Sequence, residues 1–186
     1  MKFVVKNARL SFPALFEPRD YNGDENFKWQ AHFLLPKNDP QVAALTDVML
    51  QVAKEQWGSK GQTHFDLLTS DNKLCLIDGK RKPDNEEYEG MMYISANNAK
   101  VKPDVRRRDK SKADVSDGPT LFYAGAIVLG VLDIYAQDNK FGKRINASLI
   151  GVQFMEHGDR FAGAATVADD SDFEDLAEGA DAEDFI

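Results

Sequence analysis

Cysteine is nearly absent from this sequence, since Cys75 is the only one in 186 residues. A single thiol cannot form a disulfide within the chain. It also cannot complete a zinc-finger spacing with the three histidines, His32, His64 and His157. We therefore expect neither a disulfide framework nor a structural zinc ion.

Long apolar runs and the common catalytic motifs are also missing. No stretch of about 18 consecutive apolar residues occurs, and lysines interrupt residues 1–6, where a signal peptide would be apolar. The phosphate loop, the dinucleotide fingerprint, the Gly-x-Ser-x-Gly elbow and the His-Glu-x-x-His motif do not occur. We expect a cytoplasmic protein with no membrane association, no cofactor, no metal and no catalytic residues. A carboxylate such as Asp133 leaves a metal-dependent nuclease as an alternative.

Basic residues are outnumbered, with 23 Lys and Arg against 31 Asp and Glu and a formal net charge of -8. The excess lies at the C-terminal end, because residues 167–186 hold nine acids and neither Lys nor Arg. The rest of the chain has 23 basic and 22 acidic residues, a net charge of +1, and can therefore carry a basic face. We expect one domain over residues 1–161. Residues 162–186, dominated by Ala, Gly, Asp and Glu, should form a disordered acidic tail.

Period-two alternation marks the clearest single strand. Residues 27–33 place Phe27, Trp29, Ala31 and Phe33 on one face of a half-buried strand. Farther on, glycine-interrupted β-branched and aromatic residues predict a long hairpin with its turn at residues 138–142. The strands expected elsewhere are residues 3–10, which Ser11-Phe12-Pro13 interrupts, residues 74–77, residues 89–96, and the two hairpin strands, 121–137 and 143–154.

One helix is expected within this mainly β pattern. Asp39 suits the N-cap, Pro40 suits the first helical position, and Gly58 suits the C-terminal cap. An apolar stripe between them predicts a helix that covers or plugs an antiparallel β-barrel; it consists of Val42, Leu45, Met49, Val52, Ala53 and Trp57.

A basic segment at residues 100–112 is the first candidate binding site. It has seven basic residues against two acids and too few apolar residues for a core. Lys and Arg neutralise phosphates and release counterions, which provides affinity for nucleic acid of any sequence. A solvated surface loop is the alternative. The candidate contacts here are Lys100, Lys102, Arg106, Arg107, Arg108 and Lys110.

The hairpin turn carries a second basic group. Lys140, Lys143 and Arg144 surround Phe141, and an aromatic ring between cations can stack on a base while the cations hold phosphates. A ring that merely anchors the turn is the alternative.

Other aromatic residues are weaker candidates for base stacking. Trp29 lies beside Lys28, and Tyr93 lies in an expected strand, but the alternation favours burial of Trp29 with its apolar neighbours. Phe12 and Phe16, on either side of Pro13, could serve either role.

The acidic tail ends in Asp181-Ala182-Glu183-Asp184-Phe185-Ile186. An anionic tail can occupy a basic groove when DNA is absent and be offered to a partner protein when DNA displaces it. A solubilising tail explains the acids but not the apolar Phe185 and Ile186. We expect Asp181, Glu183, Asp184, Phe185 and Ile186 to form a partner-binding motif.

Three segments of the chain resemble a family of tailed-phage single-stranded DNA-binding proteins. They are residues 7–18 (NARLSFPALFEP), 29–37 (WQAHFLLPK) and 134–154 (IYAQDNKFGKRINASLIGVQF). The resemblance implies an oligonucleotide-binding (OB) fold, an acidic tail ending in an aromatic, and a role in replication or recombination of phage DNA in the host cytoplasm. The sequence departs from the usual OB arrangement, because its helix follows the second expected strand rather than the third.

These observations together predict a sequence-independent single-stranded DNA-binding protein that protects and organises DNA. Its partners would be single-stranded DNA and, through the tail, replication or recombination proteins; a homo-oligomer is compatible with the sequence. A strand-annealing or recombination mediator that forms rings or filaments is the first alternative, and the metal-dependent nuclease is the second.

Overall fold

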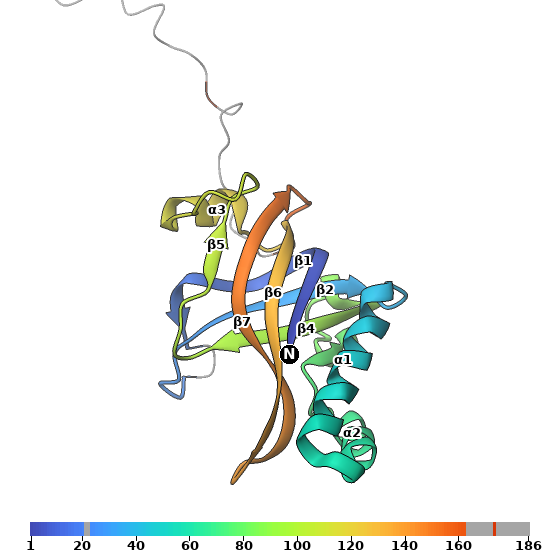
Figure 1. Cartoon of the computed structure of the whole chain (residues 1–186). Helices are drawn as coiled ribbons and strands as arrows, with labels where there is room; N and C mark the ends of the chain where they lie inside the picture. The colour runs from blue at the N-terminus through green and yellow to red at the C-terminus, as the bar shows by residue number, and fades with distance from the viewer. Residues whose placement is uncertain (21–22, 163–172, 174–186) are drawn as a thin grey trace, which may run out of the picture.

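A computed structural model of the chain describes residues 1–20, 23–162 and 173. The strands of this part form one sheet in the order β3-β4-β2-β1-β6-β7-β5, which a further pairing between β4 and β7 closes. The closed unit is a five-stranded barrel of β1, β2, β4, β7 and β6, with β3 and β5 as extra strands at its sides (Figure 1). The strands are β1 (Lys2–Arg19), β2 (Lys28–Pro36), β3 (Leu76–Asp78), β4 (Met91–Asn98), β5 (Asp104–Arg106), β6 (Ile127–Asn139) and β7 (Gly142–Glu156).

The expected antiparallel pattern changes at β7, which pairs in parallel with β4, where the barrel closes, and also with β5. β4 and β7 pair in parallel, with Ala96 opposite Ala147 and Asn97 opposite Ser148. The order β1-β2-β4-β7-β6 is that of an OB barrel, so the expected mainly β, OB-like fold is confirmed.

The predicted helix is present as α1, Pro40–Trp57, and it follows the second strand. The Asp39 carboxylate accepts a hydrogen bond from the Gln41 amide at 2.8 Å, which satisfies one of the free donors at the helix start. The buried stripe of Leu45, Met49, Val52 and Ala53 packs into the barrel core.

More helix exists than the single one predicted. Phe65 and Leu68 are buried on α2, which follows α1 after one short turn. Figure 1 shows α1 and α2 beside the barrel, at the end from which the β6–β7 hairpin projects. The remaining helical segments are η1 (Gly58–Lys60), α2 (Gly61–Ser70), η2 (Gly79–Arg81), η3 (Glu86–Tyr88), η4 (Val115–Asp117) and α3 (Gly118–Leu121).

The first strand continues through Ser11-Phe12-Pro13, where an interruption was expected. β1 absorbs these residues by shifts in register, one of them between Ser11 and Ala14 in its pairing with β2. Phe12 takes a left-handed backbone conformation there, with φ 45°. The strand therefore bulges instead of ending, and its second half leaves β6 and faces α3.

No helix in the described part of the chain is long and apolar enough to cross a membrane.

Candidate nucleic-acid interface

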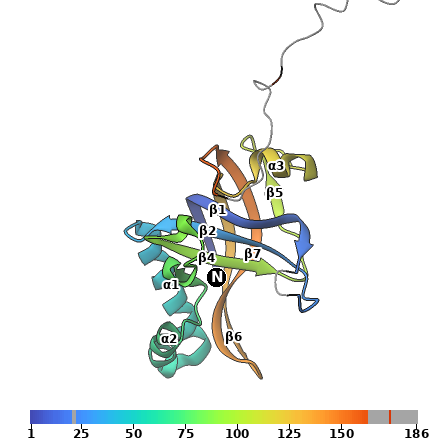
Figure 2. The same ribbon diagram turned by 180° about the vertical axis from the view of Figure 1, so that it is seen from behind.

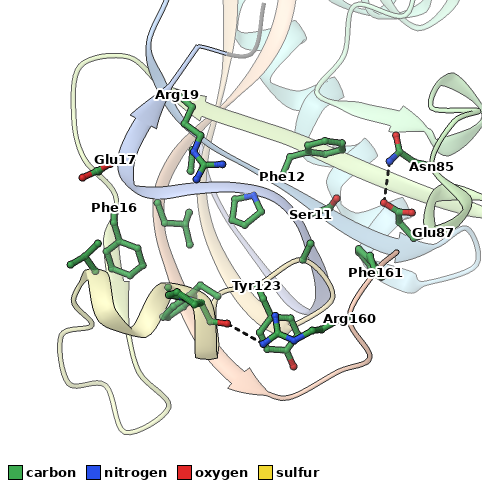
Figure 3. Close-up of a pocket in the computed structure, with 18 of the residues that line it drawn as sticks. Ser11, Phe12, Phe16, Glu17, Arg19, Asn85, Glu87, Tyr123, Arg160 and Phe161 are labelled. Carbon is green, nitrogen blue, oxygen red and sulfur yellow. Dashed lines mark hydrogen bonds between the residues drawn. The ribbon is translucent and has the colours of Figure 1, made fainter. Parts of the chain in front are cut away.

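The second half of β1 forms the floor of an open groove of about 570 Å³. Its walls come from the segment around η3, from α3, and from residues 160–162, which lie against the barrel after β7 (Figure 3). We call this hollow the β1 groove. The residues that matter for its chemistry are Phe12, Phe16, Arg19, Tyr123, Arg160 and Phe161.

Phe12 is half-buried in the β1 groove and lies beneath a cation. The Lys82 ammonium is 4.9 Å from the centre of its ring, and Lys82 comes from the loop after η2. The other edge of the ring meets His32 at a centroid distance of 5.4 Å. The bulge at Phe12 therefore presents a supported aromatic ring together with a positive charge.

Phe16 repeats this arrangement four residues along the same strand. Its ring packs edge-on against Phe122 of the α3 segment at 5.8 Å, and the Lys102 ammonium lies 5.8 Å from the ring centre. Phe16 also lines a smaller adjoining hollow with Lys102 and Lys112. The sequence left the role of both phenylalanines open, and the structure places them in one groove.

A buried aromatic cluster supports Phe12 from below. The Nδ1 atom of His32 lies 2.8 Å from the Tyr88 hydroxyl, and the rings of Tyr88 and Tyr93 are 5.0 Å apart. Burial, followed by the nearby charge of Lys82, lowers the pKa of His32 to about 3. Burial also raises the pKa of Tyr88 well above its usual range. The cluster is therefore neutral at ordinary pH.

The segment after β7 is fastened to the rim of the groove. The Tyr123 hydroxyl donates to the Gly158 carbonyl at 2.8 Å, and the Arg160 guanidinium lies 3.9 Å from the Tyr123 ring centre. Arg9 donates to the backbone carbonyls of Gly125 and Asp159, and its guanidinium lies 4.7 Å from the Phe161 ring centre. These contacts hold Arg160 and Phe161 in the groove wall, and the acidic part of the sequence follows directly.

The basic segment at residues 100–112 is more ordered than a mobile loop. Arg106 pairs with Asp104 at 2.7 Å, and Arg107 pairs with Asp117 at 2.8 Å and with Asp114 at 3.2 Å. These two arginines are partly neutralised within the fold. Arg108, Lys100, Lys102 and Lys110 are exposed and form no ion pair with any described residue; of these, Lys102 lies at the groove.

The hairpin turn lies at the other end of the molecule from α3 and β5 (Figures 1 and 2). Phe141 is 79% exposed, and the Lys140 ammonium is 5.0 Å from its ring centre. Lys143 pairs with Asp138, whereas Arg144 is exposed without an ion pair to any described residue. The two basic groups that the sequence singled out are therefore not neighbours.

The weaker aromatic candidates are placed by β2 and β4. Tyr93 is only 5% exposed within the cluster under Phe12, so little of its ring is accessible to a base in this conformation. Trp29 pairs with Asn98 and is half-buried, with its indole Nε1 unpaired among the described residues, and Lys28 beside it is half-exposed. Phe27 is 58% exposed, so the predicted buried face begins only at Trp29. Asp133 pairs with the N-terminal ammonium at 2.7 Å.

Comparisons with known proteins identify the family of this chain. Residues 1–186 match the family described as "Enterobacter phage Enc34, ssDNA-binding protein". The chain belongs to this Enc34 family. Putative protein p50 of Acyrthosiphon pisum secondary endosymbiont phage 1 is 37% identical over 180 residues, which cover 95% of each chain.

Solved structures of phage single-stranded DNA-binding proteins have the same fold as this chain. The single-stranded DNA-binding protein of bacteriophage Enc34, in complex with single-stranded DNA, is 28% identical with a TM-score of 0.71, covering 86% of this chain and 89% of that one. The gp2.5 single-stranded DNA-binding protein of bacteriophage T7 is 12% identical with a TM-score of 0.57, covering 90% and 98%, and supports the fold alone. A family of binding proteins agrees with the expectation of a non-enzymatic protein.

Several groove residues of this Enc34 family member were missed from the sequence. Lys82, Arg19, Arg160 and Phe161 lie outside every segment that the sequence marks as a binding site. A signal did exist for Arg9 and the two groove phenylalanines, because residues 7–18 carry the family resemblance. The motif Asp181 to Ile186 lies outside the described residues.

Proposed function

We propose that this protein binds single-stranded DNA without sequence preference, with bases stacked in the β1 groove. The observation that carries the proposal is the repeated pair on β1: Phe12 beneath Lys82 and Phe16 beneath Lys102. Every base has an aromatic face, so stacking on phenylalanine accepts any sequence, and the lysines are placed to hold the phosphates.

On binding, a DNA base would replace the lysine ammonium as the partner of each phenylalanine ring. Without DNA, each ammonium lies over an aromatic ring, which is a weak interaction at an exposed site. A base that stacks on the ring displaces the ammonium, which then pairs with the phosphate of the same strand. Arg19 and Arg160 also line the groove, but Glu17 and Glu87 balance their charges, so the two lysines supply its excess positive charge.

The acidic segment would regulate access to this groove. The last residue described before it, Ala162, lines the groove, so the nine acids of residues 167–186 begin a few residues from the binding site. A tethered anionic segment competes with DNA at a high effective concentration. DNA would then displace the segment and make Phe185 and Ile186 available to a replication or recombination protein in the host cytoplasm.

A titration of single-stranded against double-stranded oligonucleotides at two salt concentrations tests the proposal. We expect tighter binding of single strands, equal affinity for different base compositions, and weaker binding at higher salt because phosphate contacts release counterions. A duplex hides the faces of its bases, so equal affinity for duplex and single strand would contradict stacking in the groove.

A further inference from the structure

The β6–β7 hairpin tip has features that folding of the barrel does not require. Phe141 has the highest exposure among the large apolar side chains of the described residues. Lys140 and Arg144 beside it are exposed and form no ion pair with any described residue. A projecting aromatic ring flanked by two exposed cations has the chemistry of a contact surface.

The projection is also held in a fixed direction. The Trp57 indole at the end of α1 donates to the Asp138 carboxylate at 2.9 Å, and Asp138 also pairs with Lys143. The Lys143 ammonium lies 5.5 Å from the Trp57 ring centre. At the turn itself, the Phe141 amide donates to the Asn139 side chain at 2.9 Å. A braced hairpin loses little conformational entropy on binding, which favours a docking role.

We infer that the hairpin tip, Lys140, Phe141 and Arg144, is the docking surface for the acidic segment of a second copy of this chain. This inference rests on the proposed function, because the segment is free to dock only after DNA has displaced it from its own groove. The two surfaces are chemically complementary. The segment has acids followed by the apolar Phe185 and Ile186, and the hairpin tip has cations around an exposed apolar ring.

The position of the two surfaces favours a neighbouring molecule over the same one. The segment starts at Ala162 beside α3, and the hairpin tip lies at the opposite end of the barrel (Figures 1 and 2). A flexible chain of 24 residues, the number that follow Ala162 in the sequence, would have a root-mean-square span of about 27 Å. A body of this size is about 40 Å across. The chain therefore meets the hairpin of an adjacent copy more readily than its own.

Such a contact is head to tail, since a copy that offers its segment to one neighbour keeps its own hairpin for another. Contacts of this kind repeat, and they produce open rows rather than rings when successive copies follow an extended strand. The weak single contact would act only between copies that a DNA strand already holds side by side, where the effective concentration is high. The result would be cooperative binding along long strands, without self-association of the free protein.

A double-mutant cycle tests the inference. One variant carries Lys140→Ser, Phe141→Ser and Arg144→Ser; a second ends at residue 162; a third combines both changes. The control carries Leu67→Ser and Lys60→Ser, which remove an exposed apolar residue and a cation from α2 and the turn before it. Thermal melting of each variant shows that it is folded.

Two DNA substrates separate the inference from the proposed function. An oligothymidylate of about eight nucleotides accommodates one protein and reports the groove, whereas long polythymidylate reports contact between neighbours. We expect wild type and control to bind long strands cooperatively. Each single variant should lose about tenfold in cooperativity, and the combined variant should lose no more than either alone.

Three results would overturn the inference. Additive losses in the combined variant would show that hairpin and segment act separately. Non-cooperative binding of long strands by the wild type would show that bound copies do not contact one another. If the hairpin change weakens binding of the short oligonucleotide even in the chain that ends at residue 162, the tip binds DNA instead. Failure of wild type to bind the short oligonucleotide would instead contradict the proposed function.

Discussion

The β1 groove and the hairpin tip both present phenylalanine with lysine, yet the two regions are built differently. In the groove, Phe12 and Phe16 are half-buried, and their cations come from two other loops, through Lys82 and Lys102. At the tip, Phe141 is largely exposed to solvent and its cation is the preceding residue. The groove combines side chains from distant parts of the chain, whereas the exposed side chains of the tip all lie within residues 140–144.

This difference determines what each region can bind. A ring set in a wall of other side chains offers one face, excludes water from its edge, and holds a flat partner in one orientation. A ring at a tip offers both faces but little enclosure, so it contributes only together with something that holds the partner nearby. We therefore assign the principal DNA affinity to the groove and a contact between neighbouring molecules to the tip.

The largest expected effect separates the two regions directly. Phe12→Leu together with Phe16→Leu retains apolar packing but removes both aromatic faces, so binding of a short oligothymidylate should weaken about a hundredfold, since stacking is worth about 1 to 3 kcal/mol per base. Phe141→Leu should change it by less than about twofold. Fluorescence anisotropy with a labelled oligonucleotide measures both. Equal losses of affinity from the groove and hairpin changes would contradict the assignment of different roles to the two regions.

The support beneath the groove should lose stability between pH 6.5 and pH 5, whereas the hairpin should not, because hydrogen bonds from Lys143 and Trp57 lower the pKa of its Asp138 carboxyl below the ordinary 3.8. The folded chain holds the pKa of His32 at about 3, below its ordinary 6.5, so the unfolded chain binds a proton first as the pH falls. Stability that is complete above pH 6.5 is then lost toward pH 3, at up to about 1.4 kcal/mol per pH unit.

Urea unfolding at pH 7 and pH 5 measures this loss, with His32→Phe as the comparison. That variant retains a ring between Phe12 and Tyr93 and should lose most of the acid dependence. An unchanged pH dependence in the variant would assign the acid sensitivity to other groups.

Removal of residues 163–186 should raise the affinity of the groove for a short single strand and should not change the conformation of the hairpin. We expect the affinity for a short single strand to rise about tenfold at low salt, and the gain to shrink at high salt, where the competing acids are screened. Titrations of both chains at two salt concentrations provide the comparison. Unchanged or lower affinity after the deletion would exclude competition by the acidic segment.

The smallest effects concern neighbouring arginines that the sequence treats alike. Arg108 is unpaired among the described residues, so Arg108→Ala should weaken binding severalfold on every sequence and lower the salt slope by about one. Arg107 pairs with Asp114 and Asp117, so Arg107→Ala should mainly lower the melting temperature. The opposite ranking in affinity would mean that the ion pairs open when DNA binds.

Local signals were sufficient to predict much of this fold. The Asp39-Pro40 start and Gly58 bound the helix correctly, and the turn at residues 138–142 lies inside the observed hairpin. The second helix was missed because Gly58 and Gly61 suggest that helical structure ends there, whereas Phe65 and Leu68 find their partners only in the assembled core. The parallel closure of β4 on β7 joins residues about fifty positions apart and leaves no local pattern.

The groove was harder to predict for a related reason. Alternation along a strand assigns side chains to faces only while the register holds, and the bulge at Phe12 shifts it. Phe12 and Phe16 were therefore visible as aromatics without an assignable face. The ion pairs that neutralise Arg107 span up to ten residues and were likewise hidden, so the basic segment seemed more available than it is.

Photo-crosslinking tests most directly where the bases lie. A short oligonucleotide that carries 5-iodouracil, which reacts with aromatic rings stacked on it, is irradiated with the full chain, and the modified peptides are identified by mass spectrometry. We predict crosslinks at Phe12 or Phe16, which disappear in the double leucine variant. Crosslinks confined to Phe141 and its neighbours would contradict the assignment of DNA binding to the β1 groove.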